Sequence, residues 1–208
     1  MTLVLLGGLG TTHAMWDQQL AVFPDAIALD LPARVTVEAI ARDVLDAVPG
    51  RFSFCGLSLG GMVGMWLGAF APERIDRLVL ACTGPKLGTK ADYDARAELV
   101  RREGMDVVVD GARERWFTPG FRDDPRAQRI LDDLRGIDPE AYAACAEAVG
   151  DFDFRADVER IAVPTLVVYG RDDPVTAERA LPGVEIPGAH LASVESPDEF
   201  NHHLRSAA

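Results

Sequence analysis

The sequence predicts an α/β fold built on a mostly parallel sheet, and three observations support this prediction. Short apolar runs alternate with stretches of helical spacing along most of the 208 residues, which is the pattern of a parallel sheet covered by helices on both faces. A Gly-x-Ser-x-Gly motif follows one apolar run and precedes a helical pattern. Residues 91–160 break the alternation, because their spacing is helical throughout.

Six segments are predicted to be strands, because each is a short apolar run bounded by turn residues. The first ends at Gly7-Gly8, the third runs into the Gly-x-Ser-x-Gly motif, and the fifth ends at Gly170. In chain order the predicted strands are residues 2–6, 26–30, 51–55, 75–82, 163–169 and 184–186. A sheet of about six mostly parallel strands follows.

The predicted helices divide into two groups. Those that alternate with the strands are residues 36–47, 60–70 and, after the helix-start signal Ser196-Pro197, 195–205. The block before the penultimate strand adds residues 92–103, 106–117, 124–134 and 138–149. Its run from Met105 to Val109 also has strand-like composition, and we predict helix because the surrounding block is helical. We therefore predict a core of residues 1–90 and 161–208 and a helical cap insertion of residues 91–160, over the sheet edge where ligands bind.

Composition limits the class of protein and its partners. An apolar content of 48% indicates a globular chain, and no apolar run approaches the roughly 20 residues of a membrane span. The first strand lacks a basic flank, so no signal peptide is expected. The net charge of −12 argues against nucleic acid and anionic membranes as partners, whereas a small anionic ligand needs only a local basic group. Since Cys55, Cys82 and Cys145 cannot form a complete disulfide set, we expect free thiols and a cytoplasmic location. The sequence carries no signature of an oligomeric state.

The Gly-x-Ser-x-Gly motif predicts a nucleophile at Ser58. A sharp turn between strand and helix lifts a serine hydroxyl out of the sheet, and flanking glycines give the strained turn room. The hydroxyl needs a base. His190 follows the last short strand and is expected at the same edge, whereas the adjacent His202 and His203 are expected to be solvated. His13 follows the first strand, but no neighbouring carboxylate is evident.

The remaining groups of the candidate site follow from the loops at the same edge. The base needs an acid to fix its tautomer, and the fifth strand runs into Asp172-Asp173, either of which could serve. An oxyanion would be held by the backbone N–H of Leu59, directly after the serine. The Leu9 N–H, in the glycine-rich loop after the first strand, is the second predicted donor.

With its order of serine, aspartate and histidine, the chain resembles the α/β-hydrolase superfamily and, within it, the 3-oxoadipate enol-lactonases. In the family pattern the acid stands three residues after the glycine that ends the strand, which implies Asp173. The matching stretches are residues 10–17, 54–62, 71–80, 114–119, 163–170 and 189–201.

The resemblance has three departures. Gly7-Gly8 stands where the family usually has His-Gly, although an oxyanion hole made by backbone groups is expected to survive this change. The chain begins at what would be the family's third strand, so two leading strands are expected to be missing. The loop after Asp30 lacks the usual Arg-Gly-x-Gly turn, and only 16 residues separate Asp173 from His190. The expected fold is therefore a trimmed α/β-hydrolase fold.

The resemblance implies hydrolysis of 3-oxoadipate enol-lactone to 3-oxoadipate, a step of aromatic catabolism, through an acyl-enzyme and without a metal or organic cofactor. Because that substrate carries a free carboxylate, a cationic partner is expected in the cap. Arg113 and Arg115 are candidates, and a solvated helix face is the alternative for both. Trp116 either lines the pocket or packs the cap.

Three other functions fit parts of the sequence. Gly8-x-Gly10 after a strand, with Asp30 further on, resembles a dinucleotide fingerprint, but its third glycine is missing and Ser58 would have no role. A carboxylesterase, another lactonase or a carbon–carbon bond hydrolase would share the fold and the Ser–His–Asp set. A catalytically weak binding protein of the same fold would follow if the altered oxyanion loop were damaged.

Overall fold

A parallel sheet of six strands organises the chain in the computed structural model, which describes residues 2–207 apart from the side chains of residues 206 and 207. The strands are β1 (Leu3–Leu6), β2 (Ile27–Leu29), β3 (Phe52–Leu57), β4 (Ile75–Ala81), β5 (Thr165–Gly170) and β6 (Val184–Ile186). Their order is β2-β1-β3-β4-β5-β6, and every neighbouring pair is parallel. The predicted fold class is confirmed.

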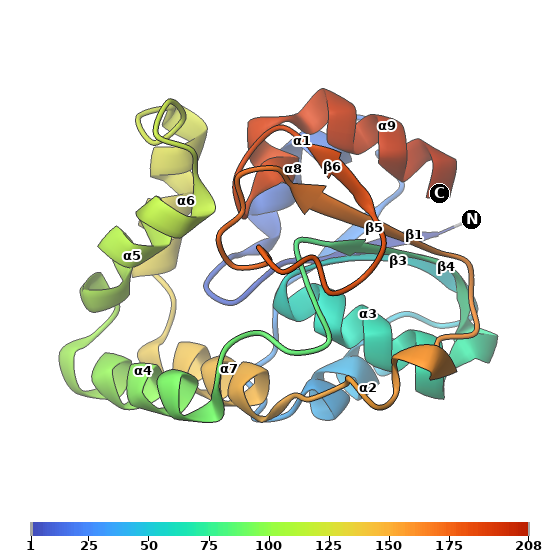
Figure 1. The fold of residues 1–208 in the computed structure, drawn as a ribbon, viewed down its shortest axis with the longest axis horizontal. Coiled ribbons are helices and arrows are strands. Elements are labelled where there is room, and N and C mark those ends of the chain that lie inside the picture. The colour runs from blue at the N-terminus through green and yellow to red at the C-terminus, as the bar shows by residue number, and fades with distance from the viewer. Residues whose placement is uncertain (1, 208) are drawn as a thin grey trace.

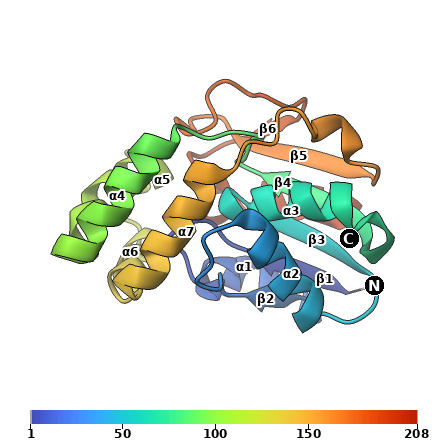
Figure 2. The ribbon, with the colours of Figure 1, turned by 90° about the horizontal axis from the view of Figure 1, so that it is seen from below.

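Helices cover both faces of this sheet, with α2 and α3 on one face and α1 and α9 on the other (Figures 1 and 2). The helices are α1 (Asp17–Leu20), α2 (Val37–Ala47), α3 (Leu59–Phe70), α4 (Lys90–Glu103), α5 (Asp106–Trp116), α6 (Pro125–Arg135), α7 (Pro139–Asp151), α8 (Ala192–Glu195) and α9 (Pro197–Ala207). Short 3₁₀ turns are η1 (His13–Trp16), η2 (Pro72–Arg74) and η3 (Val158–Arg160). The terminal helix predicted over 195–205 is confirmed as α9, which begins at Pro197, where a missing N–H is tolerated, and a separate short helix, α8, precedes it.

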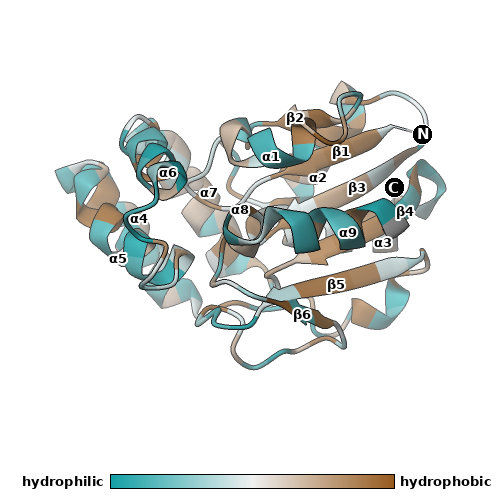
Figure 3. Ribbon diagram, turned by 90° about the horizontal axis from the view of Figure 1, so that it is seen from above, coloured by the Kyte–Doolittle hydropathy of each residue, from teal (hydrophilic) through white to brown (hydrophobic). Residues whose placement is uncertain are grey.

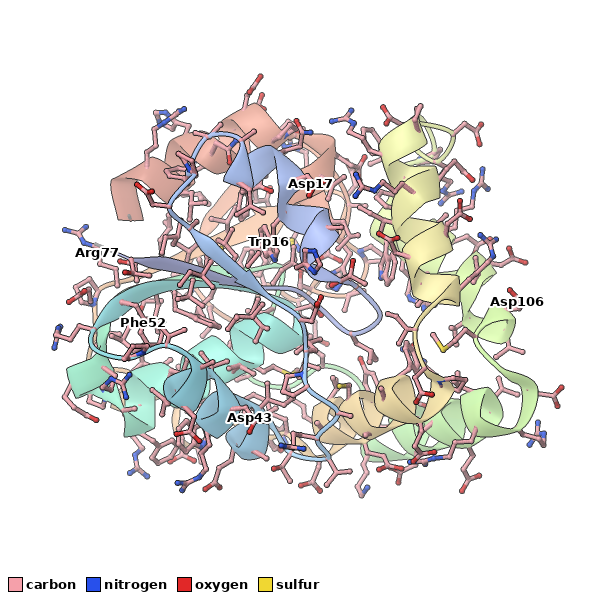
Figure 4. The ribbon with its side chains drawn as sticks, turned by 180° about the vertical axis from the view of Figure 1, so that it is seen from behind. Trp16, Asp17, Asp43, Phe52, Arg77 and Asp106 are labelled. Atoms are coloured by element: carbon pink, nitrogen blue, oxygen red, sulfur yellow. The ribbon has the colours of Figure 1, made fainter. Side chains whose placement is uncertain are left out.

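The alternating sides of the strands build two cores. In β1, Leu3 and Leu5 belong to the core shared with α9, whereas Val4 and Leu6 belong to the core shared with α2 and α3. Figure 4 shows Trp16 and Phe52 on opposite sides of the sheet, and both side chains are fully buried. Figure 3 shows apolar strands beneath helices with hydrophilic outer faces. Each large apolar side chain buried in this way contributes roughly 1.5–3 kcal/mol to folding.

Helices α4 to α7 lie between β4 and β5 in the chain and stand beyond the C-terminal ends of the strands (Figure 1). The segment from Met105 to Val109 is helical there, as predicted, apart from Met105, which caps the helix. Strand β1 lies between β2 and β3, so the chain leaves β1 to one side and later returns on the other. Such a switch point opens a crevice at the C-terminal edge. Within the described residues, no helix combines the length and apolar character needed to cross a membrane.

Candidate active site

Ser58 occupies the turn between β3 and α3 with a strained backbone. Its φ and ψ angles are 55° and −113°, a conformation that a residue with a Cβ adopts only when its surroundings impose it. The Ser58 N–H donates to the Ala81 carbonyl at 2.9 Å, and the Thr83 hydroxyl donates to the Ser58 carbonyl at 2.8 Å. Strand β4 and the residues after it therefore hold the turn in place.

The glycines around Ser58 stand where three backbone segments meet. A Cβ on Gly56 would lie 2.0 Å from the Gly60 carbonyl oxygen, and a Cβ on Gly60 would lie 2.2 Å from that of Leu6. A Cβ on Gly8 would lie 3.1 Å from the Ser58 Cβ. The loop after β1 thus approaches the serine closely only because these positions lack side chains.

Replacing Gly60 with alanine is expected to destabilise the fold by about 1–3 kcal/mol or more, because the added methyl meets strand backbone that cannot turn away. The measurement is the free energy of unfolding in urea. Gly120→Ala is the matched control, since a Cβ at Gly120 would have no heavy atom within 4 Å beyond its chain neighbours. Equal stability of the two variants would contradict this account of the turn.

His190 and Asp173 form a buried pair at the same edge. The His190 Nδ1 lies 3.0 Å from Asp173 Oδ2, and the residues are 4% and 3% exposed. The Thr176 hydroxyl donates to Oδ2 at 2.5 Å and the Val175 N–H to Oδ1 at 2.8 Å. Burial acts to raise the pKa of Asp173, but the His190 ring and these hydrogen bonds outweigh it, and the pKa lies below its ordinary value. Asp172 is exposed.

Ser58 and His190 both line a cavity of about 540 Å³ between the sheet edge and the cap. Among the described residues, no hydrogen bond joins the Ser58 hydroxyl to the His190 ring, a contact that often tightens only when substrate binds. A nucleophile, a base and a buried acid with this arrangement can transfer an acyl group from an ester to water.

The two predicted oxyanion donors lie at the start of α3 and in the loop after β1. Leu59 is the first residue of α3, so its N–H has no partner within the helix, and Leu9 lines the cavity. Within the described residues, neither N–H donates to a backbone carbonyl.

Thr11 sets the shape of the loop after β1 that contains Gly7. A Cβ on Gly7 would lie 2.3 Å from the Thr11 Oγ1 and 2.8 Å from the Met15 Sδ. The Thr11 N–H and hydroxyl both donate to the Gly8 carbonyl, at 3.1 and 2.9 Å. The Thr11 and Met15 side chains fill the place of a larger residue, so the loop has its own internal support.

Two arginines of the cap reach the cavity. Arg115 from α5 and Arg96 from α4 both line it, and neither forms an ion pair with a carboxylate of the described residues. Burial, and next the positive charge of Arg96, lower the pKa of Arg115. Tyr142 lines the same wall, and burial raises its pKa while Arg96 opposes that rise. The site therefore has two cations facing one cavity, which favours an anionic ligand.

The other predicted cap residues are placed differently. Trp116 is 7% exposed and lines the cavity. Arg113 does not line it and pairs with the exposed Asp123 at 2.7 Å. Arg96 was missed because its segment resembles a solvated helix; its spacing of three from Tyr93, on one helix face, was the available signal.

The remaining histidines lie outside the cavity. The expectation that His13 lacks a carboxylate is wrong, because its Nδ1 lies 3.0 Å from Asp30, which pairing of β1 with β2 brings close. Both side chains are more than half exposed. His202 is exposed and His203 half-buried. Among the described residues, no group of three or more His, Cys, Asp or Glu side chains could hold a metal.

Comparison with known proteins identifies a family and its relatives. The model of the alpha/beta hydrolase family matches residues 3–203. The chain is 33% identical to 3-oxoadipate enol-lactonase 2 of Acinetobacter baylyi, over 98% of this chain and 87% of that protein. It is 30% identical to the pimeloyl-[acyl-carrier protein] methyl ester esterase of Nitrosomonas europaea, over 84% of this chain and 78% of that one.

Among solved structures, the enol-lactonase from Burkholderia xenovorans LB400 matches with a TM-score of 0.90 and 30% identity, over 99% of this chain and 90% of that one. These relatives are lactone and ester hydrolases by name, and they share the fold described above.

Proposed function

The chain belongs to the alpha/beta hydrolase family, and on that premise we propose that it is a serine hydrolase of carboxylic esters or lactones. Ser58 is the nucleophile, His190 the base and Asp173 the acid that orients the base. The observation that carries the proposal is the buried His190–Asp173 pair, whose histidine lines the same cavity as the strained Ser58.

The mechanism proceeds through an acyl-enzyme. The Ser58 Oγ attacks the carbonyl carbon while the His190 Nε2 accepts its proton, and Asp173 stabilises the resulting imidazolium. The N–H groups of Leu9 and Leu59 donate to the tetrahedral oxyanion. Collapse breaks the bond to the leaving oxygen, which takes the proton from His190. Water, deprotonated by His190, then attacks the acyl-enzyme, and collapse of the second tetrahedral intermediate returns that proton from His190 to the Ser58 Oγ and releases the acid.

We propose 3-oxoadipate enol-lactone as the substrate and 3-oxoadipate as the product. The similarity to enol-lactonases supports this choice. So do Arg96 and Arg115, because the substrate carries a carboxylate that two cations in a partly buried cavity would bind. The leaving enol becomes a ketone, which makes ring opening strongly downhill.

Steady-state hydrolysis of the enol-lactone beside p-nitrophenyl acetate tests the proposal, with Ser58→Ala as the blank. We expect a kcat/KM for the lactone of roughly 10⁴ M⁻¹s⁻¹ or more. Turnover of the simple ester alone would support the assignment as a serine hydrolase and reject the enol-lactone as its substrate. Turnover of neither would reject both and favour a binding role.

Arg115→Ala is expected to raise KM for the anionic lactone by about 10-fold or more, because it removes a charge-assisted contact worth roughly 1.5–3 kcal/mol. Activity on neutral p-nitrophenyl acetate should stay close to that of the wild type. Arg113→Ala is the matched control, two residues away and paired on the surface with Asp123. An unchanged KM in Arg115→Ala would remove this role.

A methyl ester esterase is the second candidate function. The similarity to the Nitrosomonas europaea esterase favours it, and the cavity of about 540 Å³ has room for an acyl group larger than acetyl. Faster hydrolysis of methyl esters of dicarboxylic acids than of the enol-lactone would select this function.

A further inference from the structure

Glu195, at the end of α8, connects the cap to the loop that carries His190. Its Oε1 accepts from the Ala189 N–H at 2.8 Å and from the Thr118 N–H at 3.1 Å. Its Oε2 accepts from the Thr118 hydroxyl at 2.6 Å. One half-buried carboxylate thus binds the residue before the histidine and the chain just beyond α5.

The same two segments are also joined through their backbones. The His190 N–H donates to the Arg115 carbonyl at 3.3 Å, and the Leu191 N–H donates to the Trp116 carbonyl at 3.0 Å. These contacts and those of Glu195 place residues 115–118 directly beside residues 189–191. Both carbonyls belong to the last turn of α5, where they lack partners within the helix, and the Glu195 carboxylate bonds to the chain just beyond that turn and to the residue before His190.

We infer that Glu195 is a positioning residue for His190. Its carboxylate holds the Ala189 N–H and residues 115–118 in one arrangement. The position of His190, which follows Ala189, depends on this arrangement. Because reaction rate depends steeply on placement of the base, a displacement of about 1 Å can lower the rate about 100-fold. This role rests on the proposed function, in which His190 is the base.

Two substitutions of Glu195 distinguish a positioning role of its hydrogen bonds from a purely electrostatic role of its charge. In Glu195→Gln, the amide oxygen can still accept from the Ala189 and Thr118 N–H groups, and the Thr118 hydroxyl can turn to accept from the amide nitrogen. Glutamine therefore keeps the connection without the charge, whereas alanine removes the connection.

The test compares Glu195→Ala and Glu195→Gln with a control that loosens the cap elsewhere. Arg129 of α6 donates to Asp17 of α1 at 2.7 Å, so Asp17→Asn weakens a cap–core contact far along the chain from His190. On p-nitrophenyl acetate we expect kcat to fall about 10- to 100-fold in Glu195→Ala with KM nearly unchanged. Glu195→Gln should retain most of the rate, and Asp17→Asn all of it.

A second readout does not depend on turnover. The ring resonances of His190, assigned by their loss in His190→Gln, should shift in Glu195→Ala and stay unchanged in Asp17→Asn. If Glu195→Ala does not fold, Thr118→Val removes only the hydroxyl hydrogen bond to Oε2, keeps the bonds from the Thr118 N–H, and should give a smaller fall in kcat. Wild-type kcat and unshifted resonances in Glu195→Ala or Thr118→Val would overturn the inference. If the His190 resonances shift in Glu195→Ala but the wild type shows no hydrolysis that depends on Ser58, the proposed function is overturned and the positioning contact is not.

Discussion

Replacing Ser58 with alanine is expected to lower kcat for ester or lactone hydrolysis by about four to six orders of magnitude. Without the hydroxyl no acyl-enzyme forms, because His190 has no serine proton to accept and no alkoxide to generate. The oxyanion donors and the cavity remain, so the residual rate reflects binding and electrostatic stabilisation alone. Steady-state kinetics with p-nitrophenyl acetate measures the loss.

The same variant should fold as the wild type does. Alanine also has a Cβ, so the strain at φ 55° is unchanged, and the hydrogen bonds to Ala81 and Thr83 involve the backbone of residue 58. We expect a stability change within about 0.5 kcal/mol in urea denaturation. Activity near that of the wild type in this folded variant would reject Ser58 as nucleophile.

Asp173→Asn is expected to lower kcat by about 10³- to 10⁴-fold. An amide at this position cannot hold the proton of His190 on Nδ1, so Nε2 no longer serves as the base. It also cannot accept at both positions now bonded to Thr176 and Val175. Kinetics with the same ester measures the effect, and Asp172→Asn is the control because its side chain is exposed. Equal losses in the two variants would contradict the assignment.

The dependence of the unfolding free energy on pH in the acid range gives an independent check that Asp173 is ionised and paired in the folded state. Its pKa in the folded state lies below the ordinary value, so its ionised form stabilises the fold above the unfolded pKa of about 3.9. That contribution is lost as pH falls through the folded pKa. The difference in unfolding free energy between the wild type and Asp173→Asn should therefore narrow below about pH 4.

Local sequence signals predicted the strands and the turn at Ser58, because both depend on neighbouring residues. Pairings between distant segments were not predictable in this way. Asp30 reaches His13 only through the β1–β2 pairing, and Glu195 reaches Thr118 across 77 residues. The sequence pattern could not tell whether Arg113 or Arg115 faces the cavity. Residues two apart on a helix point about 200° apart, but packing of the helix decides which of the two faces meets the cavity.

Because residues 115–118 contact the His190 loop, some parts of the cap tolerate substitutions of their lining side chains better than others. One wall of the cavity, at Arg115 and Trp116, is built on backbone that also supports the base. Other lining residues, Arg96, Leu134 and Tyr142, come from α4, α6 and α7. Altering substrate range by protein engineering, or by natural divergence, is therefore best achieved on these three helices, where side chains can be exchanged without moving the histidine.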